Sequence, residues 1–169
     1  MKKYLNGFIF LVLLLCIGCK KEITKTTIYD DTVFLLNDKV VYQTASEKTK
    51  QKSSTQFISI LYADLFATSI SAEELYDLGQ MTLSCGDKQL MNNMIVDNYI
   101  NDMGASIPSD ASMRGDIELF VTQTYVRFFL RNPTAYELYF LKNVIMNDAS
   151  MTPNLVYQAF ASSNEYLFY

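Results

Sequence analysis

Few side chains of this 169-residue chain can act as nucleophiles or bases, because the sequence contains no histidine and only three cysteines. The missing histidine excludes Ser-His-Asp and Cys-His catalysis and every histidine-bearing metal site. No G-x-S-x-G elbow, Walker loop or C-x-x-C pair occurs either. Acidic residues such as Asp97 and Asp102 lack the D-x-D-x-D spacing of a calcium loop. We therefore predict no metal and no other cofactor.

Carboxylates alone can hydrolyse glycosidic bonds, so they are the remaining catalytic candidates. Glu74, Glu137 or Glu165 would supply the acid in that reaction. Glu74 and Glu137 each stand three residues after a Ser or Thr, the spacing of a capping box, which predicts a structural role for both. We predict no catalytic residue and expect that the protein is not an enzyme.

The N-terminus has the pattern of a secretory signal. Lys2 and Lys3 precede an apolar run at residues 8–17, which is too short for a hydrocarbon core that needs about 20 residues. The run ends in Leu15-Cys16-Ile17-Gly18-Cys19, which resembles the bacterial lipobox. The resemblance implies removal of residues 1–18 and attachment of lipid, including a palmitate-type acyl chain, to Cys19. An ordinary signal peptide cut elsewhere is the alternative.

Cys85 is the one thiol that this processing leaves unmodified, so no internal disulfide can form in the mature chain. With no histidine to activate it, Cys85 is expected to be a buried, inert, small apolar side chain.

Binding residues are predicted in the C-terminal half, where tyrosine and phenylalanine are concentrated. Arg127 and Arg131 lie one helical turn apart and could grip a carboxylate of a partner. The alternative is that they pair within the fold, with Glu137 or Asp64. Tyr136 and Tyr139 flank Glu137, and exposed tyrosines suit contact with protein or sugar. Tyrosines that pack inward are an equally open reading.

Charge and composition divide the mature chain in two. Residues 19–53 carry seven Lys against five acids, whereas residues 54–169 carry five Lys or Arg against thirteen acids. The acidic body argues against nucleic acid as a partner. Residues 19–53 are mostly polar and are predicted to be a lipidated tether. Within them, residues 32–42 are apolar enough to dock on the domain, as a hairpin or as a short helix.

Residues 54–169 read as a single all-α domain. Glycine and proline are sparse, and apolar residues recur at spacings of three and four. Six helices are predicted, with starts at Ser53, Ser71, Asp87, the end of the 105–112 loop, Thr134 and Thr152-Pro153. The third of these helices is expected to stop at Gly104.

The body contains an apparent internal repeat. Residues 57–78 match residues 120–141 at eight of 22 positions without a gap, including Glu74 with Glu137. Amphipathic helices resemble one another in any case, but shared caps and an ungapped register favour duplication. We predict two pseudo-repeated three-helix units. Asp64 and Arg127 occupy the same repeat position with opposite charge and would pair if the units meet about a two-fold axis.

The second unit resembles phycobilisome-linker-like and related extracellular helical repeat modules. The pattern runs from Tyr125 through Arg131, Pro133 and Glu137-Leu138 to Glu165-Tyr166. It covers about 45 residues, and weakly the first unit, which has Thr68 and Ile70 where arginine and proline would stand. The resemblance implies a helical scaffold or interaction module and carries over no catalytic residue.

Together these features predict a non-enzymatic lipoprotein of the bacterial envelope. We expect lipid on Cys19 to anchor the protein in the outer membrane, and the sequence does not distinguish the periplasmic face from the cell-surface face. We also expect the protein to bind an unidentified protein partner as an accessory or scaffold subunit. A glycan or peptidoglycan binding module is the alternative, and a carboxylate-based enzyme that cleaves peptidoglycan is the third.

Overall fold

The computed structural model describes residues 40–169, which belong to a compact unit of the chain, Thr32–Tyr169. The predicted signal peptide, Cys19 and most of the apolar segment 32–42 lie outside the described residues. The choice between a hairpin and a helix for that segment therefore stays open.

The described residues are all-helical, which confirms the predicted fold class. No β-strand occurs among residues 40–169, where a single antiparallel bridge joins Gln51 to Phe168. The elements are η1 (Ala45–Glu47), α2 (Ser54–Phe66), α3 (Ala72–Ser84), α4 (Lys88–Ile100), α5 (Asp110–Gly115), α6 (Ile117–Phe129), α7 (Ala135–Asn147), α8 (Pro153–Ala161) and η2 (Glu165–Leu167).

Capping side chains start the helices where the sequence predicted. Ser53 with Gln56, and Thr134 with Glu137, each close a complete capping box. Ser71 accepts the N–H of Glu74, but no return bond from the Ser71 N–H to Glu74 is present in the described residues. The Glu74 carboxylate instead accepts a bond from the Tyr99 hydroxyl of α4, at 3.4 Å. The predicted second box is thus only half formed.

Two boundaries differ from the prediction. The third predicted helix, α4, ends at Ile100 and not at Gly104, because residues 101–104 turn and the Gly104 N–H binds the Asp102 carboxylate. The predicted loop 105–112 contains the start of the short helix α5, which Ser109 caps. Asp116 then caps α6, so one residue both ends α5 and begins the next helix.

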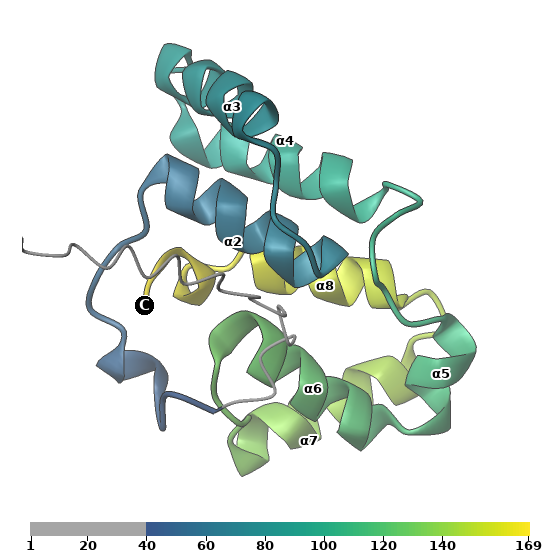
Figure 1. Cartoon of the computed structure of the whole chain (residues 1–169). Helices are drawn as coiled ribbons and strands as arrows, with labels where there is room; N and C mark the ends of the chain where they lie inside the picture. Colours follow the sequence, from purple (N-terminus) through teal and green to yellow (C-terminus); the bar gives the residue numbers. More distant parts are fainter. Residues whose placement is uncertain (1–39) are drawn as a thin grey trace, which may run out of the picture. The chain divides into compact units, whose positions relative to one another are not determined.

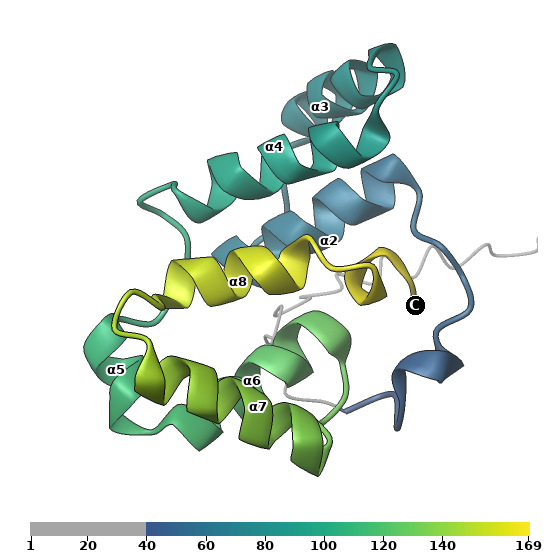
Figure 2. The same cartoon turned by 180° about the vertical axis from the view of Figure 1, so that it is seen from behind.

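Four helices supply most of the core, and two cover it from outside. Most buried apolar side chains come from α2, α4, α6 and α8. The buried residues of α3 are Gly79 and Thr82, and the buried residue of α7 is Ile145. Helix α2 packs on α3 and α4, α4 packs on α8, and α8 packs on α6, which also holds α7 (Figures 1 and 2).

The bounds of two pairs of helices coincide under one shift along the sequence. The shift that aligns residue 57 with residue 120 also brings both ends of α2 onto those of α6, and both ends of α3 onto those of α7. Both inner helices end in a left-handed residue, Ala67 and its repeat equivalent Leu130, with φ of 53° and 54° and ψ of 28° in each. Two segments of different sequence thus make the same helix–turn–helix hairpin, α2–α3 and α6–α7.

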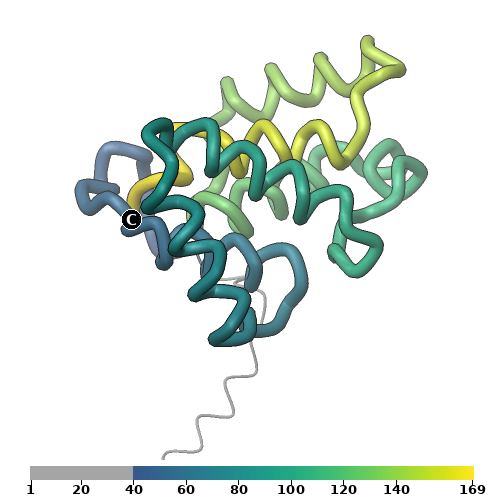
Figure 3. Tube along the Cα trace, turned by 90° about the horizontal axis from the view of Figure 1, so that it is seen from above, coloured from purple at the N-terminus to yellow at the C-terminus, as the bar shows by residue number. Residues whose placement is uncertain are grey.

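The described part of the predicted tether packs on the C-terminal residues. Lys50 and Tyr169 exchange two backbone hydrogen bonds of 2.9 Å, and the Lys52 N–H donates to the Leu167 carbonyl. Figure 3 shows the C-terminal end beside the first described residues. Residues 40–53 therefore contribute to the folded unit. Among the described helices, none is both long and apolar enough to cross a membrane.

Candidate functional site

A buried ion network lies at the turn between α6 and α7. Arg131 follows the left-handed residue Leu130 and is only 3% exposed. Its guanidinium donates to both carboxylate oxygens of Glu137, at 2.7 and 2.9 Å, and to both oxygens of Glu165, at 2.8 Å. Lys48, also buried, lies 3.1 Å from Glu165. The network joins the α6–α7 turn, the C-terminal η2 and the segment before α2.

Aromatic rings enclose the cations of this network. The Arg131 guanidinium lies 5.0 Å from the ring centre of Tyr125, and Lys48 Nζ lies 5.0 Å from that of Phe129. Cations over aromatic faces are stabilised by the ring quadrupole. The positive charges of Arg131 and Lys48 are therefore stabilised both by carboxylates and by aromatic rings.

The pKa values of both carboxyl groups in the network are lowered, so both are ionised at neutral pH. Hydrogen bonds from Arg131 lower the pKa of Glu137 to about 2. Burial would raise the pKa of Glu165, but hydrogen bonds from Arg131 and Lys48 outweigh it and the pKa is lowered. A glycosidase acid needs a raised pKa, so neither carboxylate is suited to donate a proton. The pairing fits a structural role.

A second buried cluster ties α2 to the C-terminal segment. The Tyr166 hydroxyl donates to Asp64 at 2.6 Å, and Lys52 Nζ donates to the Tyr166 carbonyl and lies 3.7 Å from the Tyr166 ring centre. Burial raises the pKa of Asp64 to about 6 and lowers the pKa of Lys52 to about 8. Both groups thus carry pKa values near neutrality.

Asp64, Lys52 and Arg127 line one cavity of about 240 Å³, which we call the Lys52 cavity. Arg127 donates to the Ser106 carbonyl at 2.8 Å and stacks 5.3 Å over Tyr157. The sequence predicted that Arg127 and Asp64 pair across the repeat. The structure brings them to the same cavity, but no ion pair within 4.0 Å joins them in the described residues.

The outer side of α7 carries exposed apolar side chains. Tyr136 is 74% exposed and Tyr139 is 68% exposed, and the Tyr136 ring stacks on Phe140. Phe140 and Met146 are also more than half exposed. At spacings of three, four and seven residues these side chains share one helical face. We call Tyr136, Tyr139, Phe140 and Met146 the α7 aromatic face.

The predicted binding residues thus fall in three environments. Tyr136 and Tyr139 are on the surface, Arg127 lines the Lys52 cavity, and Arg131 is enclosed with Glu137 and Glu165. The guanidinium of Arg131 is therefore occupied by Glu137 and Glu165 and is not presented to a partner carboxylate. Of the two predicted roles, Arg131 has the one in which it pairs within the fold. Cys19 lies outside the described residues.

Cys85 is not buried as predicted. The residue is half-buried after α3, and its thiol lies 3.4 Å from the Asp87 carbonyl oxygen. Cys85 stands between exposed Ser84 and Gly86 in the turn from α3 to α4, which leaves the thiol partly accessible. Among the described residues, no group of three or more acidic, cysteine or histidine side chains is arranged to hold a metal ion.

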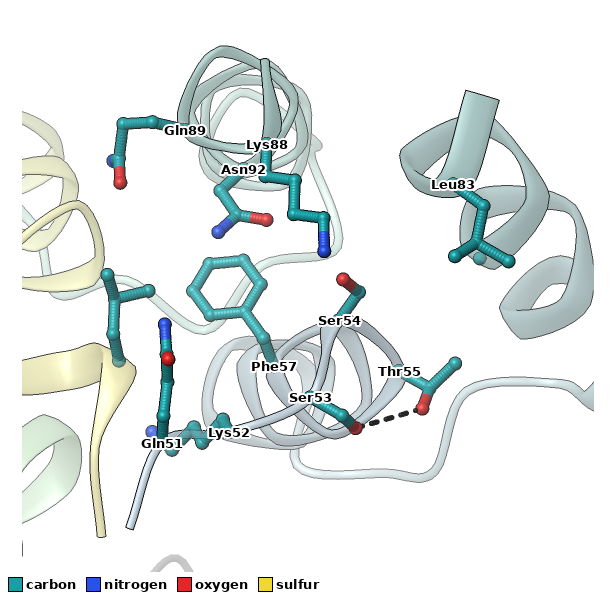
Figure 4. Close-up of a pocket in the computed structure, with 12 residues that line it drawn as sticks. Gln51, Lys52, Ser53, Ser54, Thr55, Phe57, Leu83, Lys88, Gln89 and Asn92 are labelled. Carbon is teal, nitrogen blue, oxygen red and sulfur yellow. Dashed lines mark hydrogen bonds between the residues drawn. The ribbon is translucent and has the colours of Figure 1, made fainter. Parts of the chain in front are cut away.

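A pocket of about 430 Å³ lies at the start of α2, between α3 and α4. Figure 4 shows Lys88 and Asn92 of α4 directed toward Ser54 and the buried ring of Phe57. The hydroxyl side chains that line this Ser54 pocket are Ser53, Ser54 and Thr55, and the amides are Gln51, Gln89 and Asn92. None of its lining residues is acidic. The polar groups of the pocket are therefore hydrogen-bond donors and neutral acceptors, beside apolar wall from Phe57, Leu83 and Leu167.

Sequence reasoning missed Lys48, Lys52 and Tyr166 as parts of these clusters. Lys48, Lys50 and Lys52 alternate, and each ammonium lies over an aromatic ring. Such an alternation is the signature of an extended segment with one side turned to a neighbour. The alternation of the three lysines could have indicated a packed extended segment, but the polar composition of residues 19–53 led to the prediction of a tether.

Comparison with known proteins adds no relative. No family model matches the chain, and neither a curated protein nor a solved structure is similar to it.

Proposed function

We propose that this protein is a non-enzymatic, lipid-anchored binding module of the bacterial envelope, and that it docks a protein partner through the α7 aromatic face. The observation that carries the proposal is the exposure of Tyr136, Tyr139 and Phe140 on one side of an outer helix. Tyrosine and phenylalanine are enriched in the cores of interfaces, and tyrosine is among the residues that contribute most to binding energy.

The corresponding face of α3 supports this choice. The positions that match Tyr136 and Phe140 in α3 hold Glu73 and Asp77, whereas Tyr76 matches Tyr139. Helix α3 is equally peripheral, yet it places two carboxylates where α7 places rings. Charged residues are depleted in the centres of interfaces. The uncharged face is therefore better suited to docking.

Duplication of a hairpin accounts for the pair of faces. We infer that α2–α3 and α6–α7 descend from one unit, because a single shift along the sequence superimposes their bounds and their left-handed turn residues. Two copies that keep the same packing can diverge on their outer faces. In this reading α7 acquired the contact surface and α3 kept a solvated one.

The anchor is the second part of the proposal. The lipobox-like run that ends at Cys19 supports attachment of acyl chains, each methylene of which contributes about 0.8 kcal/mol to membrane binding. Cys19→Ser should abolish acylation, measured by mass spectrometry and by partition into a detergent phase. Unchanged membrane partition of the variant would contradict the anchor.

Docking is tested by giving α7 the charges of α3. Tyr136→Glu with Phe140→Asp recreates the acidic α3 pattern at exposed positions, so the fold should persist. Chemical cross-linking in native membranes, read by quantitative mass spectrometry, should show at least a tenfold loss of the partner that wild type captures. The matched control is Tyr76→Ala, which should keep the yield. Equal capture by both variants would refute docking at α7.

Glycan binding in the Ser54 pocket is a second candidate, favoured by its hydroxyl and amide lining (Figure 4). Such groups, placed in a concave site, fix the orientation of a polar ligand. Asn92→Ala should weaken co-sedimentation with purified peptidoglycan, whereas Asn98→Ala on the same helix, outside the pocket, should not. No co-sedimentation of wild type would exclude this candidate.

A further inference from the structure

The Lys52 cavity combines apolar walls with an excess of positive charge. Ile60, Phe128 and Leu130 supply apolar wall, and Tyr42 and Phe168 close it with aromatic rings. Helices α2 and α6 and the two ends of the described chain all contribute to it. It shares no residue with the α7 aromatic face, so an occupant of this cavity is independent of the proposed docking.

The charges around this cavity are unequal. Three cations, Lys48, Lys52 and Arg127, line it against one acid, Asp64. Glu165 neutralises Lys48 at 3.1 Å. Lys52 and Arg127 therefore remain opposite a single carboxyl group, with no ion pair within 4.0 Å between these groups in the described residues. Within a body that is acidic as a whole, this is a local positive site.

Each charged group has an anchoring contact that positions it. Lys52 Nζ donates to the Tyr166 carbonyl, Arg127 donates to the Ser106 carbonyl, and Asp64 accepts the Tyr166 hydroxyl. One bond to a neutral acceptor leaves an ammonium or a guanidinium with further donors. Cations that are removed from water and only partly bonded favour an anion beside them.

We propose that the Lys52 cavity binds a small carboxylate with an apolar body. The carboxylate would lie by Lys52 and Arg127, and the apolar body would lie against Ile60, Phe128 and Leu130. The volume of about 240 Å³ equals that of about eight liquid waters, which fits a ligand of roughly ten non-hydrogen atoms. An apolar pocket with a few convergent polar groups is the usual form of a small-molecule site.

The acid in the cavity makes binding pH-dependent. The titratable and charged groups that face it are Lys48, Lys52, Asp64, Arg127 and the phenols of Tyr42 and Tyr169. Burial raises the pKa of Asp64 to about 6, so this acid is neutral below that pH and repels an anion above it. Affinity for a carboxylate is therefore greatest near pH 5.5 and falls toward pH 7.5.

The probe is phenylacetate, titrated into the purified full chain in detergent and followed by calorimetry, with a micelle blank. We expect saturable binding, at least tenfold weaker binding of acetate and of 2-phenylethanol, and at least a tenfold loss in Arg127→Gln. Gln keeps an amide donor for the Ser106 carbonyl. Lys142→Gln, which removes a cation paired with Glu118 outside the cavity, should bind as wild type does.

Asp64→Asn separates a ligand site from a merely structural cluster. It should tighten phenylacetate binding at pH 7.5 severalfold and reduce the decline between pH 5.5 and 7.5 to the part that comes from deprotonation of Lys52, whose pKa burial lowers to about 8. Absence of saturation, equal affinity in Arg127→Gln and wild type, or equal affinity for 2-phenylethanol would each overturn the proposal. Loss of partner capture in the α7 variants would leave it unaffected, so the two proposals fail separately.

Discussion

The two hairpins α2–α3 and α6–α7 have the same helix bounds and the same turn conformation, but different side chains attach them to the rest of the protein. Both turn through a left-handed residue, Ala67 in one and Leu130 in the other. The next residue is exposed Thr68 in the first hairpin and buried Arg131 in the second. Arg131 binds Glu137 within its own hairpin and Glu165 in the C-terminal segment.

The difference shows that the turn does not require the arginine. Thr68 follows the same left-handed turn residue without an ion network, so the hairpin forms without an arginine at this position. What Arg131 adds is tertiary: it ties the second hairpin to Glu165, which also pairs with Lys48. The first hairpin is joined to the same segment through Asp64 and Tyr166 instead.

Among the substitutions that test this difference between the hairpins, removal of Arg131 should change the free energy of unfolding most. Arg131→Met leaves Glu137 and Glu165 partly buried without their main partner, and we expect a loss of about 3–5 kcal/mol in the free energy of unfolding. Thr68→Ala, at the matching exposed position, should change it by less than about 0.5 kcal/mol. Urea unfolding of both variants measures this. Equal losses would show that the network does not stabilise the second hairpin.

The two clusters should respond to pH in opposite directions. The pKa of Asp64 is raised from 3.8 to about 6, so the folded state holds a proton that the unfolded state loses between these values. Stability from Asp64 is present below about pH 4 and is lost as the pH rises through 6, by up to about 3 kcal/mol. Asp64→Asn should flatten this part of a profile of urea midpoint against pH.

Glu137 gives the opposite slope in the same profile. Its pKa is lowered from 4.5 to about 2, so its stabilisation is present above about pH 4.5 and is lost as the pH falls toward 2. Glu137→Gln should reduce this loss of stability at low pH, to which Glu165 also contributes, and leave the slope between pH 4 and 6 unchanged. A profile in which Asp64→Asn alters the loss at low pH instead would contradict the assignment.

Glycine at the two left-handed residues should separate turn geometry from packing. A non-glycine residue at positive φ costs about 1 kcal/mol, so Ala67→Gly, at an exposed site, should stabilise the protein by about that amount. Leu130→Gly relieves the same strain but removes a half-buried side chain that lines the Lys52 cavity. Thermal denaturation should show a gain for Ala67→Gly and none for Leu130→Gly.

The smallest effects should come from the caps. Thr134→Ala opens a complete capping box and should cost about 1 kcal/mol, within the usual 0.5–2 kcal/mol for a lost cap. Glu74→Ala removes a carboxylate that does not return to the Ser71 N–H, so it should cost less than about 0.5 kcal/mol. Urea midpoints of the two variants compare them. A larger loss in Glu74→Ala would mean that its bond to Tyr99 is the stronger one.

The candidate sites were only partly predictable, for reasons that differ by residue. Tyr136 and Tyr139 were predicted as binding residues because aromatic residues are concentrated in the C-terminal half, and the structure shows them exposed. For Arg131 the sequence left two readings open, a grip on a partner carboxylate or a pair within the fold, because a sequence gives the type of a side chain and not its exposure; the structure pairs it with Glu137. Lys48 and Lys52 were missed because polar neighbours made their segment read as a tether.

Local signals in the sequence determined the helices. Ser53, Thr134 and Thr152 fixed helix starts, apolar spacing of three and four fixed helical class, and the ungapped register of the repeat anticipated helix bounds that coincide under the same shift. These features act over one or two turns, through hydrogen bonds between neighbours in the chain.

Only the tertiary structure decided what the charged residues do. Lys48 meets Glu165, Lys52 meets Tyr166 and Asp64 meets Tyr166 across more than a hundred residues of chain. Whether such groups become ion pairs, a cavity lining or solvated surface depends on which helices pack together, and burial then sets their pKa values. Packing decides this because desolvation of a charge depends on all the groups that surround it in space, and the spacing of residues along the sequence does not give those surroundings.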